Sequence, residues 1–172
     1  MKKIILVGYM ASGKSEIGKL LAKKINLPFS DIDYLIENEL HKTINEIFEV
    51  EGEIYFRKKE HEVFVNKIKE NQSFVFSLGG GTPCYANNHE YFQSENIISI
   101  YLKANIETLT ERLKINKSKR PLIKDLSDVA LSEFVAKHLF DRNFYYNQCK
   151  YTIVVDDKSP TDIVEEIIKK LF

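Results

Sequence analysis

The sequence lacks the features that mark several large classes of protein. It carries 25 basic and 25 acidic side chains among 172 residues, so its formal net charge is zero. A balanced charge does not indicate a polyanion-binding surface, and we expect no nucleic-acid partner. No apolar run approaches the roughly 18 residues that a membrane span requires. The composition therefore indicates an ordinary soluble globular protein with no membrane partner.

Cysteines are also few. Cys84 and Cys149 are too far apart in sequence to indicate a disulfide scaffold or a metal knuckle. Two reduced thiols are typical of a cytosolic protein, so we expect a cytoplasmic location. Residues 2–7 place two lysines before four apolar residues, as a signal peptide does, but the apolar run ends at Gly8. We interpret this run as a first strand.

Apolar runs alternate with helical patterns along the chain, and the sequence shows no internal repeat or low-complexity tract. This alternation indicates βαβ units and a parallel sheet that is covered on both faces. The expected strands span residues 3–8, 29–31, 74–78, 97–102 and 151–155. The expected helices span residues 14–25, 33–41, 43–49, 53–70, 87–94, 105–114, 127–147 and 160–171. We interpret residues 1–172 as a single α/β domain.

The first strand leads into Gly8-Tyr9-Met10-Ala11-Ser12-Gly13-Lys14-Ser15, which fits the phosphate-loop pattern G-x-x-x-x-G-K-[ST]. Backbone N–H groups of such a loop face inward at a helix N-terminus and form a concavity for anionic oxygens. We expect Lys14 to reach the outer phosphates and the Ser15 hydroxyl to ligate Mg²⁺. A chance glycine-rich turn is the alternative, but the required strand before the loop and helix after it are both predicted.

Two aspartates, Asp31 and Asp33, follow the second expected strand, at the sheet edge where open α/β proteins bind ligands. One carboxylate could hold magnesium through water while the other meets an acceptor hydroxyl. The alternative is that either aspartate caps the following helix. The strand at 74–78 ends without an aspartate, although many phosphate-loop enzymes place a magnesium-binding acid there. Asp31 is therefore the expected magnesium partner.

Two further stretches combine charge or glycine with a defined spacing. Arg57 and Glu60 are three residues apart on the helix expected at 53–70, so they share a face and can pair. The alternative is a solvated charged surface, but the planar fork of Arg57 also suits a carboxylate. Gly79-Gly80-Gly81 carries a large entropic cost, which favours a backbone that a ligand approaches closely over a plain turn.

Other polar residues are less informative by themselves. Arg142 is most simply a surface arginine, and the four histidines show no ligand spacing, so we interpret them as structural or surface residues. Residues 114–125 interrupt the helical pattern with basic side chains and a proline. They fit either a solvated linker or a basic lid that closes over phosphates.

Taken together, these stretches resemble the shikimate kinase family, small ATP-dependent kinases of aromatic amino-acid biosynthesis. The resemblance runs through nearly the whole chain, and the order of the motifs is its specific part. Besides the phosphate loop, it rests on Asp31-x-Asp33, Glu51-Gly52-Glu53 leading to Phe56-Arg57 and Glu60, Gly79-Gly80-Gly81, Arg120-Pro121-Leu122, and Arg142-x-x-x-Tyr146.

The resemblance implies the nucleoside-monophosphate-kinase type of phosphate-loop fold, with a five-stranded parallel sheet in the order 2-3-1-4-5. It also implies a substrate-binding segment near residues 33–60 and a lid near residues 112–124. The implied reaction moves the γ-phosphoryl group of ATP to the 3-hydroxyl of shikimate, with Mg²⁺ as cofactor. ATP and shikimate are the expected partners of a monomeric enzyme.

The resemblance assigns a role to each candidate residue. The implied catalytic residues are Lys14, Asp33 and Arg120. The residues expected to contact ATP are Ala11, Ser12, Gly13, Lys14, Ser15, Glu16, Arg112 and Arg120. The residues expected to contact shikimate are Asp33, Arg57, Glu60, Gly79, Gly80, Gly81 and Arg142. Magnesium is expected on Ser15 and, through water, on Asp31.

The sequence departs from the family pattern in two places. Glu16 stands where the family usually has threonine, near the α-phosphate, so its carboxylate should repel the nucleotide unless it turns away. The lid run at 116–119 matches poorly, and Arg112 is the candidate for stacking on adenine.

Three other functions fit parts of the sequence. Another small-molecule or nucleoside-monophosphate kinase would share the loop and lid but present its arginines to a phosphate or sugar. A GTP-driven switch usually recognises guanine with the motif N-K-x-D. Residues 116–119 match its first two positions but have lysine in place of the aspartate, which argues against a switch. The third alternative is a non-catalytic relative of the kinases, and Glu16 is the one residue that favours this hypothesis.

Overall fold

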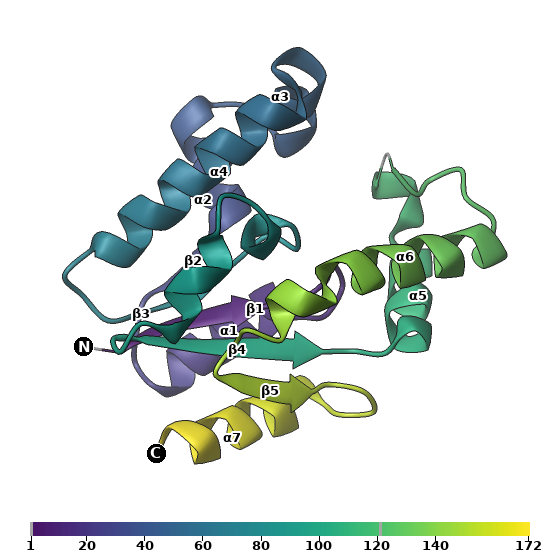
Figure 1. The fold of residues 1–172 in the computed structure, drawn as a ribbon. Coiled ribbons are helices and arrows are strands. Elements are labelled where there is room, and N and C mark those ends of the chain that lie inside the picture. Colours follow the sequence, from purple (N-terminus) through teal and green to yellow (C-terminus); the bar gives the residue numbers. More distant parts are fainter. Residues whose placement is uncertain (1, 121) are drawn as a thin grey trace.

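Five strands form one parallel sheet in the order β2-β3-β1-β4-β5 (Figure 1). They are β1 (Lys3–Val7), β2 (Phe29–Asp31), β3 (Phe74–Ser77), β4 (Ile97–Lys103) and β5 (Tyr151–Val154). The computed structural model describes residues 2–120 and 122–172. The strand order and the parallel pairing confirm the predicted fold class.

The α-helices begin and end within one residue of their predicted limits. They are α1 (Lys14–Lys24), α2 (Ile32–Leu40), α3 (Ile44–Val50), α4 (Gly52–Lys69), α5 (Ile106–Ile115), α6 (Asp128–Tyr146) and α7 (Pro160–Leu171). Among residues 2–120 and 122–172, every helix is too short or too polar to cross a membrane.

Three short 3₁₀ helices complete the described chain: η1 (Thr82–Cys84), η2 (Asn88–Gln93) and η3 (Lys117–Lys119). The helix predicted at 87–94 is present as η2, but it is a 3₁₀ helix rather than an α-helix. Backbone bonds there span three residues, as from the Glu90 N–H to the Asn87 carbonyl at 3.0 Å. The Asn88 side chain is buried and donates to the Thr82 carbonyl at 2.9 Å, which ties η2 to η1.

The sheet owes its position to the apolar runs seen in the sequence. All five residues of β1 are buried, as expected for a central parallel strand that is covered on both faces. Helices α1 and α7 pack against each other beside the sheet, while α6 crosses its near side in Figure 1. The strands therefore present only their ends and connecting loops to ligands.

The connections after β2 and β4 are enlarged and lie on two sides of the sheet. Helices α2, α3 and α4 pack together as one group, and α5 packs against α6. Figure 1 shows α3 and α4 at one side of the molecule and the segment between α5 and α6 at the other. The carboxyl ends of the strands lie between these groups, and the candidate site is built there.

Candidate active site

The phosphate loop follows β1 and is folded tightly over its own residues. A Cβ added to Gly8 would lie 2.6 Å from Ser12 Oγ and 2.8 Å from the Leu102 carbonyl oxygen, so glycine is required there. Gly13 has a φ of 94°, in the left-handed region that favours glycine, and α1 begins at Lys14. The loop therefore ends at a helix N-terminus, whose free N–H groups attract anions.

Lys14 is buried inside this loop. Its Nζ donates a hydrogen bond to the Tyr9 carbonyl oxygen at 2.9 Å. Burial lowers the pKa of Lys14 to about 8, although the carboxylates of Asp33 and Asp31 oppose the shift. The protein alone therefore compensates the lysine charge poorly, and an anionic phosphate beside Nζ would favour the charged form.

Asp31 caps α2, which is the alternative considered from the sequence, and its second oxygen faces the phosphate loop; its magnesium role stays a prediction. Its Oδ1 accepts a hydrogen bond from the Asp33 backbone N–H at 3.0 Å, which caps α2. Its Oδ2 accepts one from Ser15 Oγ at 2.6 Å. The end of β2 and the start of α1 therefore bring a carboxylate and a hydroxyl together at one point.

Ser77 lies beside Asp31 on the neighbouring strand and lines the same cavity, and sequence reasoning missed it. It pairs in register with Asp31 across β2 and β3 and is 1% exposed. Its Oγ has no hydrogen-bond partner in the described part of the chain. Residues 2–120 and 122–172 hold no group of three or more His, Cys, Asp or Glu suited to a metal. The oxygens present fit Mg²⁺, which takes one or two carboxylates together with substrate phosphates and water.

Asp33 lies at the start of α2, open to the same edge. Partial removal of its carboxyl from water raises its pKa to about 6. The neighbouring carboxylates of Asp31 and Glu60 act in the same direction, and Lys14 opposes them. Asp33 Oδ1 is 3.6 Å from the position that a Cβ on Gly79 would occupy. A carboxylate with a pKa this close to neutral can accept a proton from an acceptor hydroxyl.

Arg57 and Glu60 form the ion pair that their spacing on α4 predicts. Arg57 Nη1 donates to Glu60 Oε2 at 2.8 Å, and the Glu60 side chain is 1% exposed. Thr82 Oγ1 donates to the other oxygen of Glu60 at 2.6 Å. The pair is therefore enclosed by the loop after β3, and the alternative of a solvated surface is wrong.

The Gly79–Gly81 run lets these side chains lie directly on the backbone. Cβ atoms added to its first, second and third glycines would lie 2.8 Å from Glu60 Oε1, 3.2 Å from Arg142 Nη1 and 2.5 Å from Arg57 Nη2. None of the three glycines has a positive φ, so they are required for close approach rather than for an unusual backbone angle. The groups that approach this backbone are therefore side chains of the protein itself, among them Arg57 and Arg142.

Arg142 reaches the same run from α6. Its guanidinium carbon lies 5.6 Å from the centre of the Tyr9 ring. Tyr146, one helical turn later, is fully buried and donates its hydroxyl to the Gly80 carbonyl oxygen at 2.6 Å. These contacts correct the simplest interpretation of Arg142 as a surface arginine, because its side chain is turned into the site.

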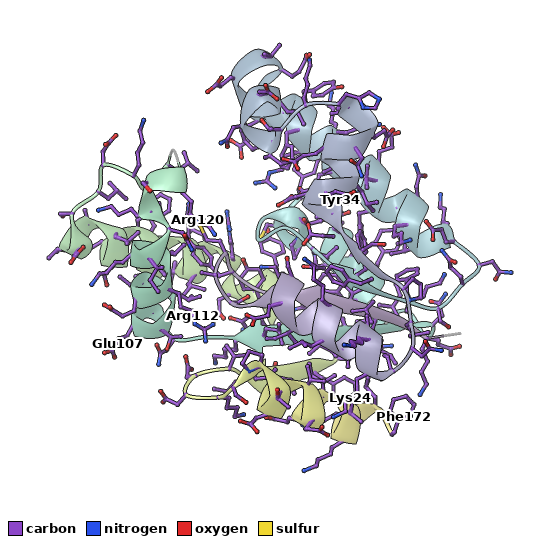
Figure 2. The ribbon with its side chains drawn as sticks, turned by 180° about the vertical axis from the view of Figure 1, so that it is seen from behind. Lys24, Tyr34, Glu107, Arg112, Arg120 and Phe172 are labelled. Atoms are coloured by element: carbon purple, nitrogen blue, oxygen red, sulfur yellow. The ribbon has the colours of Figure 1, made fainter. Side chains whose placement is uncertain are left out.

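Two arginines from the α5–α6 segment contact the phosphate loop (Figure 2). Arg112 Nη1 donates to the Ala11 carbonyl oxygen at 3.1 Å, and Arg120 Nη1 lies 3.7 Å from Met10 Sδ. Arg120 therefore belongs to the site rather than to a solvated linker. Stacking of Arg112 on adenine stays a prediction. Pro121, the middle residue of the expected R-P-L, lies outside the described residues.

A cavity of about 300 Å³ joins these elements at the carboxyl ends of the strands. It is lined by Met10, Ala11, Gly13, Lys14, Ser15, Glu16, Asp31, Asp33, Ser77, Leu78, Gly79, Gly80 and Arg120. Residues from the loop, the aspartate pair, the glycine run and the segment after α5 therefore meet in one space. Glu16 is exposed at its edge, so its effect on a nucleotide stays a prediction.

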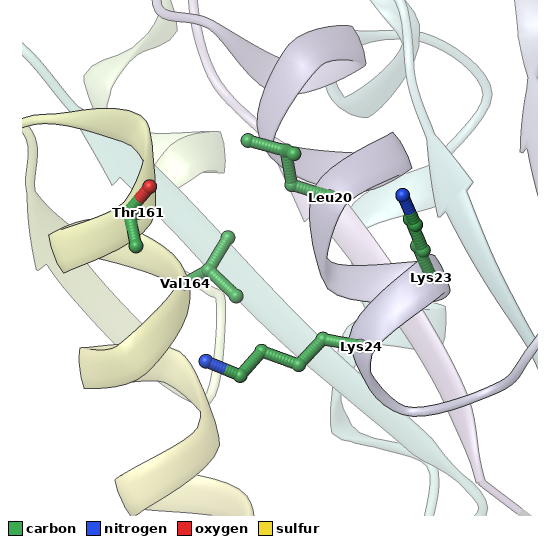
Figure 3. A pocket seen from close by; sticks show the side chains of 5 residues that line it. All are labelled: Leu20, Lys23, Lys24, Thr161 and Val164. Atoms are coloured by element: carbon green, nitrogen blue, oxygen red, sulfur yellow. The ribbon is translucent and has the colours of Figure 1, made fainter.

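A second cavity, of about 330 Å³, lies between α1 and α7 (Figure 3). Its lining residues are Leu20, Lys23, Lys24, Thr161 and Val164. Lys24 reaches across to α7 and is paired with Glu165, while Lys23 points away from that helix. This cavity offers neither a carboxylate pair nor a free cation directed inward, so it is not suited to phosphoryl transfer.

Several residues of the site could not be found from motifs alone. Ser77, Thr82 and the ring of Tyr9 act through contacts with distant parts of the chain. The missing aspartate at the end of the third strand was the one signal that pointed toward Ser77. Two of the histidines prove structural, since His61 bonds to the Asn88 side chain and His138 to the Tyr9 hydroxyl.

Comparison with known proteins identifies the family. A sequence model described as shikimate kinase matches residues 10–172. A shikimate kinase of Flavobacterium psychrophilum is 72% identical over 172 residues, which cover 100% of both chains.

Solved structures agree with this result. A shikimate kinase from Bacteroides thetaiotaomicron superposes with a TM-score of 0.90 at 32% identity and covers 99% of this chain and 98% of that one. A shikimate kinase from Acinetobacter baumannii in complex with shikimate gives a TM-score of 0.88 at 30% identity, covering 99% and 93%. The chain therefore belongs to the shikimate kinase family.

Proposed function

We propose that the protein transfers the γ-phosphoryl group of ATP to the 3-hydroxyl of shikimate, giving ADP and shikimate 3-phosphate in aromatic amino-acid biosynthesis. One observation carries the proposal: Arg57 and Arg142 converge on the Gly79–Gly81 backbone beside Asp33, next to a complete phosphate loop. Two planar guanidinium groups beside a carboxylate suit an acceptor that has both an acid group and a hydroxyl.

The phosphoryl donor would lie along the loop. The N–H groups from Ala11 to Ser15 would bind its phosphates, Lys14 would neutralise the outer ones, and Arg120 would approach from the lid. Mg²⁺ would be held by Ser15 and, through water, by Asp31, and when bound it neutralises charge on the phosphate oxygens. Phosphoryl transfer depends mainly on such positioning and charge stabilisation.

The acceptor would lie between the two arginines. Arg57, held by Glu60, and Arg142 would bind the shikimate carboxylate, and the glycine run would bound the ring. Asp33 would orient the 3-hydroxyl and take its proton as the hydroxyl oxygen bonds to the γ-phosphorus and the bond from that phosphorus to the leaving ADP oxygen breaks. Closure of the segment near residues 112–124 would exclude water and so suppress ATP hydrolysis.

All of these groups come from one chain, and we keep a monomeric enzyme as part of the proposal. The two cysteines, Cys84 and Cys149, are free thiols in the structure, which suits a cytoplasmic enzyme. We keep residues 1–172 as one domain, with an acceptor segment near 33–60.

A coupled ADP-release assay across shikimate, gluconate and nucleoside monophosphates tests the proposal. With ATP present, we expect Mg²⁺-dependent release of ADP when shikimate is the acceptor, and none with the other acceptors. In Arg57→Ala the shikimate dissociation constant should rise much more than kcat falls, because the carboxylate does not change during the reaction. An unchanged shikimate dissociation constant in Arg57→Ala would show that the acceptor is wrongly assigned.

A further inference from the structure

Tyr9 occupies a position where the phosphate-loop pattern accepts any residue, yet it is 1% exposed and contacts both halves of the site. Its carbonyl oxygen accepts hydrogen bonds from Lys14 Nζ at 2.9 Å and from the Ser12 N–H at 3.1 Å. Its ring faces the Arg142 guanidinium at 5.6 Å. One residue therefore contacts the catalytic lysine through its backbone and an acceptor arginine through its side chain.

The ring is held in place from α6. The Tyr9 hydroxyl lies 2.9 Å from His138 Nδ1. Burial raises the pKa of Tyr9 to about 12, so the hydroxyl is protonated and can donate to this nitrogen. The His138 ring in turn packs against Phe134, with 4.3 Å between ring centres. Because His138 and Arg142 are four residues apart on α6, the hydrogen bond and the guanidinium contact lie on one face of that helix.

Both acceptor arginines lie beside an aromatic ring, since the Arg57 guanidinium carbon is 5.2 Å from the centre of the Phe56 ring, so it is their ionic partners that distinguish them. Arg57 is paired with Glu60 at 2.8 Å, whereas Arg142 makes no ion pair within residues 2–120 and 122–172. A guanidinium within about 6 Å of an aromatic centre is attracted by the negative face of the ring. A neutral partner of this kind positions the arginine without neutralising the charge that an acceptor carboxylate needs.

We infer that Tyr9, fixed by His138, is a positioning residue that holds the Arg142 guanidinium in register with the phosphate loop and so tightens binding of the acceptor carboxylate. This inference rests on the proposed function. The loop thereby sets the distance between the donor and acceptor sites, in addition to binding phosphate.

The test measures the dissociation constants of shikimate and ATP by calorimetry, and KM and kcat by ADP release. Tyr9→Leu removes the ring and should raise the shikimate dissociation constant about tenfold, which corresponds to about 1.4 kcal/mol. Tyr9→Phe keeps the ring and should recover most of this loss, leaving a rise of about threefold. ATP binding should be unchanged in both variants, and KM for shikimate should rise more than kcat falls.

Two further variants separate positioning from simple support of the fold. His138→Leu should raise the shikimate dissociation constant as much as Tyr9→Phe does. Combining Tyr9→Phe with His138→Leu should raise it no further, because both changes break the same hydrogen bond. Tyr151→Leu, at a half-exposed tyrosine on β5, is the control and should leave both dissociation constants unchanged. If Tyr9→Leu does not fold, Tyr9→Phe and His138→Leu still test the coupling.

Each remaining outcome has a distinct meaning. Equal weakening of ATP and shikimate binding by Tyr9→Leu would overturn the inference, because the ring would then only support the loop. Additive losses in the double variant would also overturn it. If the unmodified protein does not bind shikimate, the proposed function itself fails. If it does bind, and Arg142→Lys weakens binding while Tyr9→Leu does not, only the inference fails.

Discussion

The donor half and the acceptor half of the site are built by different means. The donor half is the loop from Gly8 to Ser15, in which consecutive backbone groups and one lysine surround the space for phosphates. The acceptor half consists of Arg57, Glu60 and Arg142 packed on the Gly79–Gly81 backbone, and these come from α4, α6 and the loop after β3. One half is local in the chain, and the other exists only when three separate segments are packed together.

This difference predicts which kinetic constant each half should control. Charge stabilisation in the donor half is needed most in the transition state, so changes there should lower kcat. Under the proposed function, the arginines of the acceptor half would bind a carboxylate that is the same before and after transfer, so changes there should raise KM instead. Variants in each half therefore test this division between rate and substrate binding.

The largest effect is expected in the donor half, from Lys14→Ala. Loss of the cation should lower kcat about a thousandfold, because one preorganised charge at a transition state is worth that order of rate. The melting temperature should change little, because the buried charge of Lys14 is poorly compensated before phosphate binds. Steady-state kinetics and circular dichroism measure both quantities. Lys19→Ala, an exposed lysine on α1, is the control, and kcat above a tenth of normal in Lys14→Ala would contradict the prediction.

Asp33 lies between the two halves, and Asp33→Asn should lower kcat about a hundredfold if it accepts the hydroxyl proton. Its pKa in the free protein is raised to about 6, so the carboxylate is charged above that pH and protonated below it. The value of kcat/KM for shikimate should therefore fall as the pH drops through about 6, and this fall should vanish in Asp33→Asn. Asp157→Asn, at a turn residue with a φ of 55°, is the matched control. A wild-type profile that stays flat down to pH 5 would argue against proton acceptance by Asp33.

Gly81→Ala should produce a smaller effect confined to the acceptor half. The new Cβ would lie 2.5 to 2.7 Å from atoms of the Arg57 guanidinium, so the arginine must move while Glu60 holds it. We expect KM for shikimate to rise about tenfold, the order of one displaced charged hydrogen bond, with KM for ATP unchanged. Gly80→Ala is a graded comparison, since its Cβ meets Arg142 Nη1 only at 3.2 Å. Equal rises in both KM values would show that the loop after β3 had shifted as a whole.

The two halves also differ in how far the sequence alone could define them. The donor loop is contiguous, and its glycines and lysine have fixed spacing, so both its place and its chemistry could be predicted. The fold could be predicted as well, because apolar runs such as Ile4–Val7 alternate cleanly with helical patterns. The segment at 87–94 shows the limit, since a helical pattern does not reveal whether its backbone bonds span three or four residues, and η2 is a 3₁₀ helix tied to η1 through Asn88.

The acceptor half could be predicted only through the order of its motifs. No spacing rule places Arg57 against Gly81, or Arg142 against the Tyr9 ring, because each contact joins elements brought together by the sheet. Ser77 is a similar case. A serine at a strand end is ordinary in sequence, and only the folded chain shows that it lies beside Asp31 with a buried hydroxyl.

The smallest kinetic effect is expected from Thr82→Val, which removes a support of the acceptor half without touching either arginine. Thr82 Oγ1 donates to Glu60 Oε1 at 2.6 Å in a site where Glu60 is 1% exposed. The isosteric valine leaves that oxygen without a donor, which should lower the free energy of unfolding by about 1 to 3 kcal/mol. Glu60 should then hold Arg57 less firmly, so KM for shikimate should rise about twofold while kcat is unchanged.

Urea denaturation and steady-state kinetics measure these changes, and Thr82→Ser, which keeps the hydroxyl, should restore both the stability and the KM. If Thr82→Val lowered kcat instead, the division between a donor half that governs rate and an acceptor half that governs binding would not hold, because a contact remote from the phosphates would then control transfer.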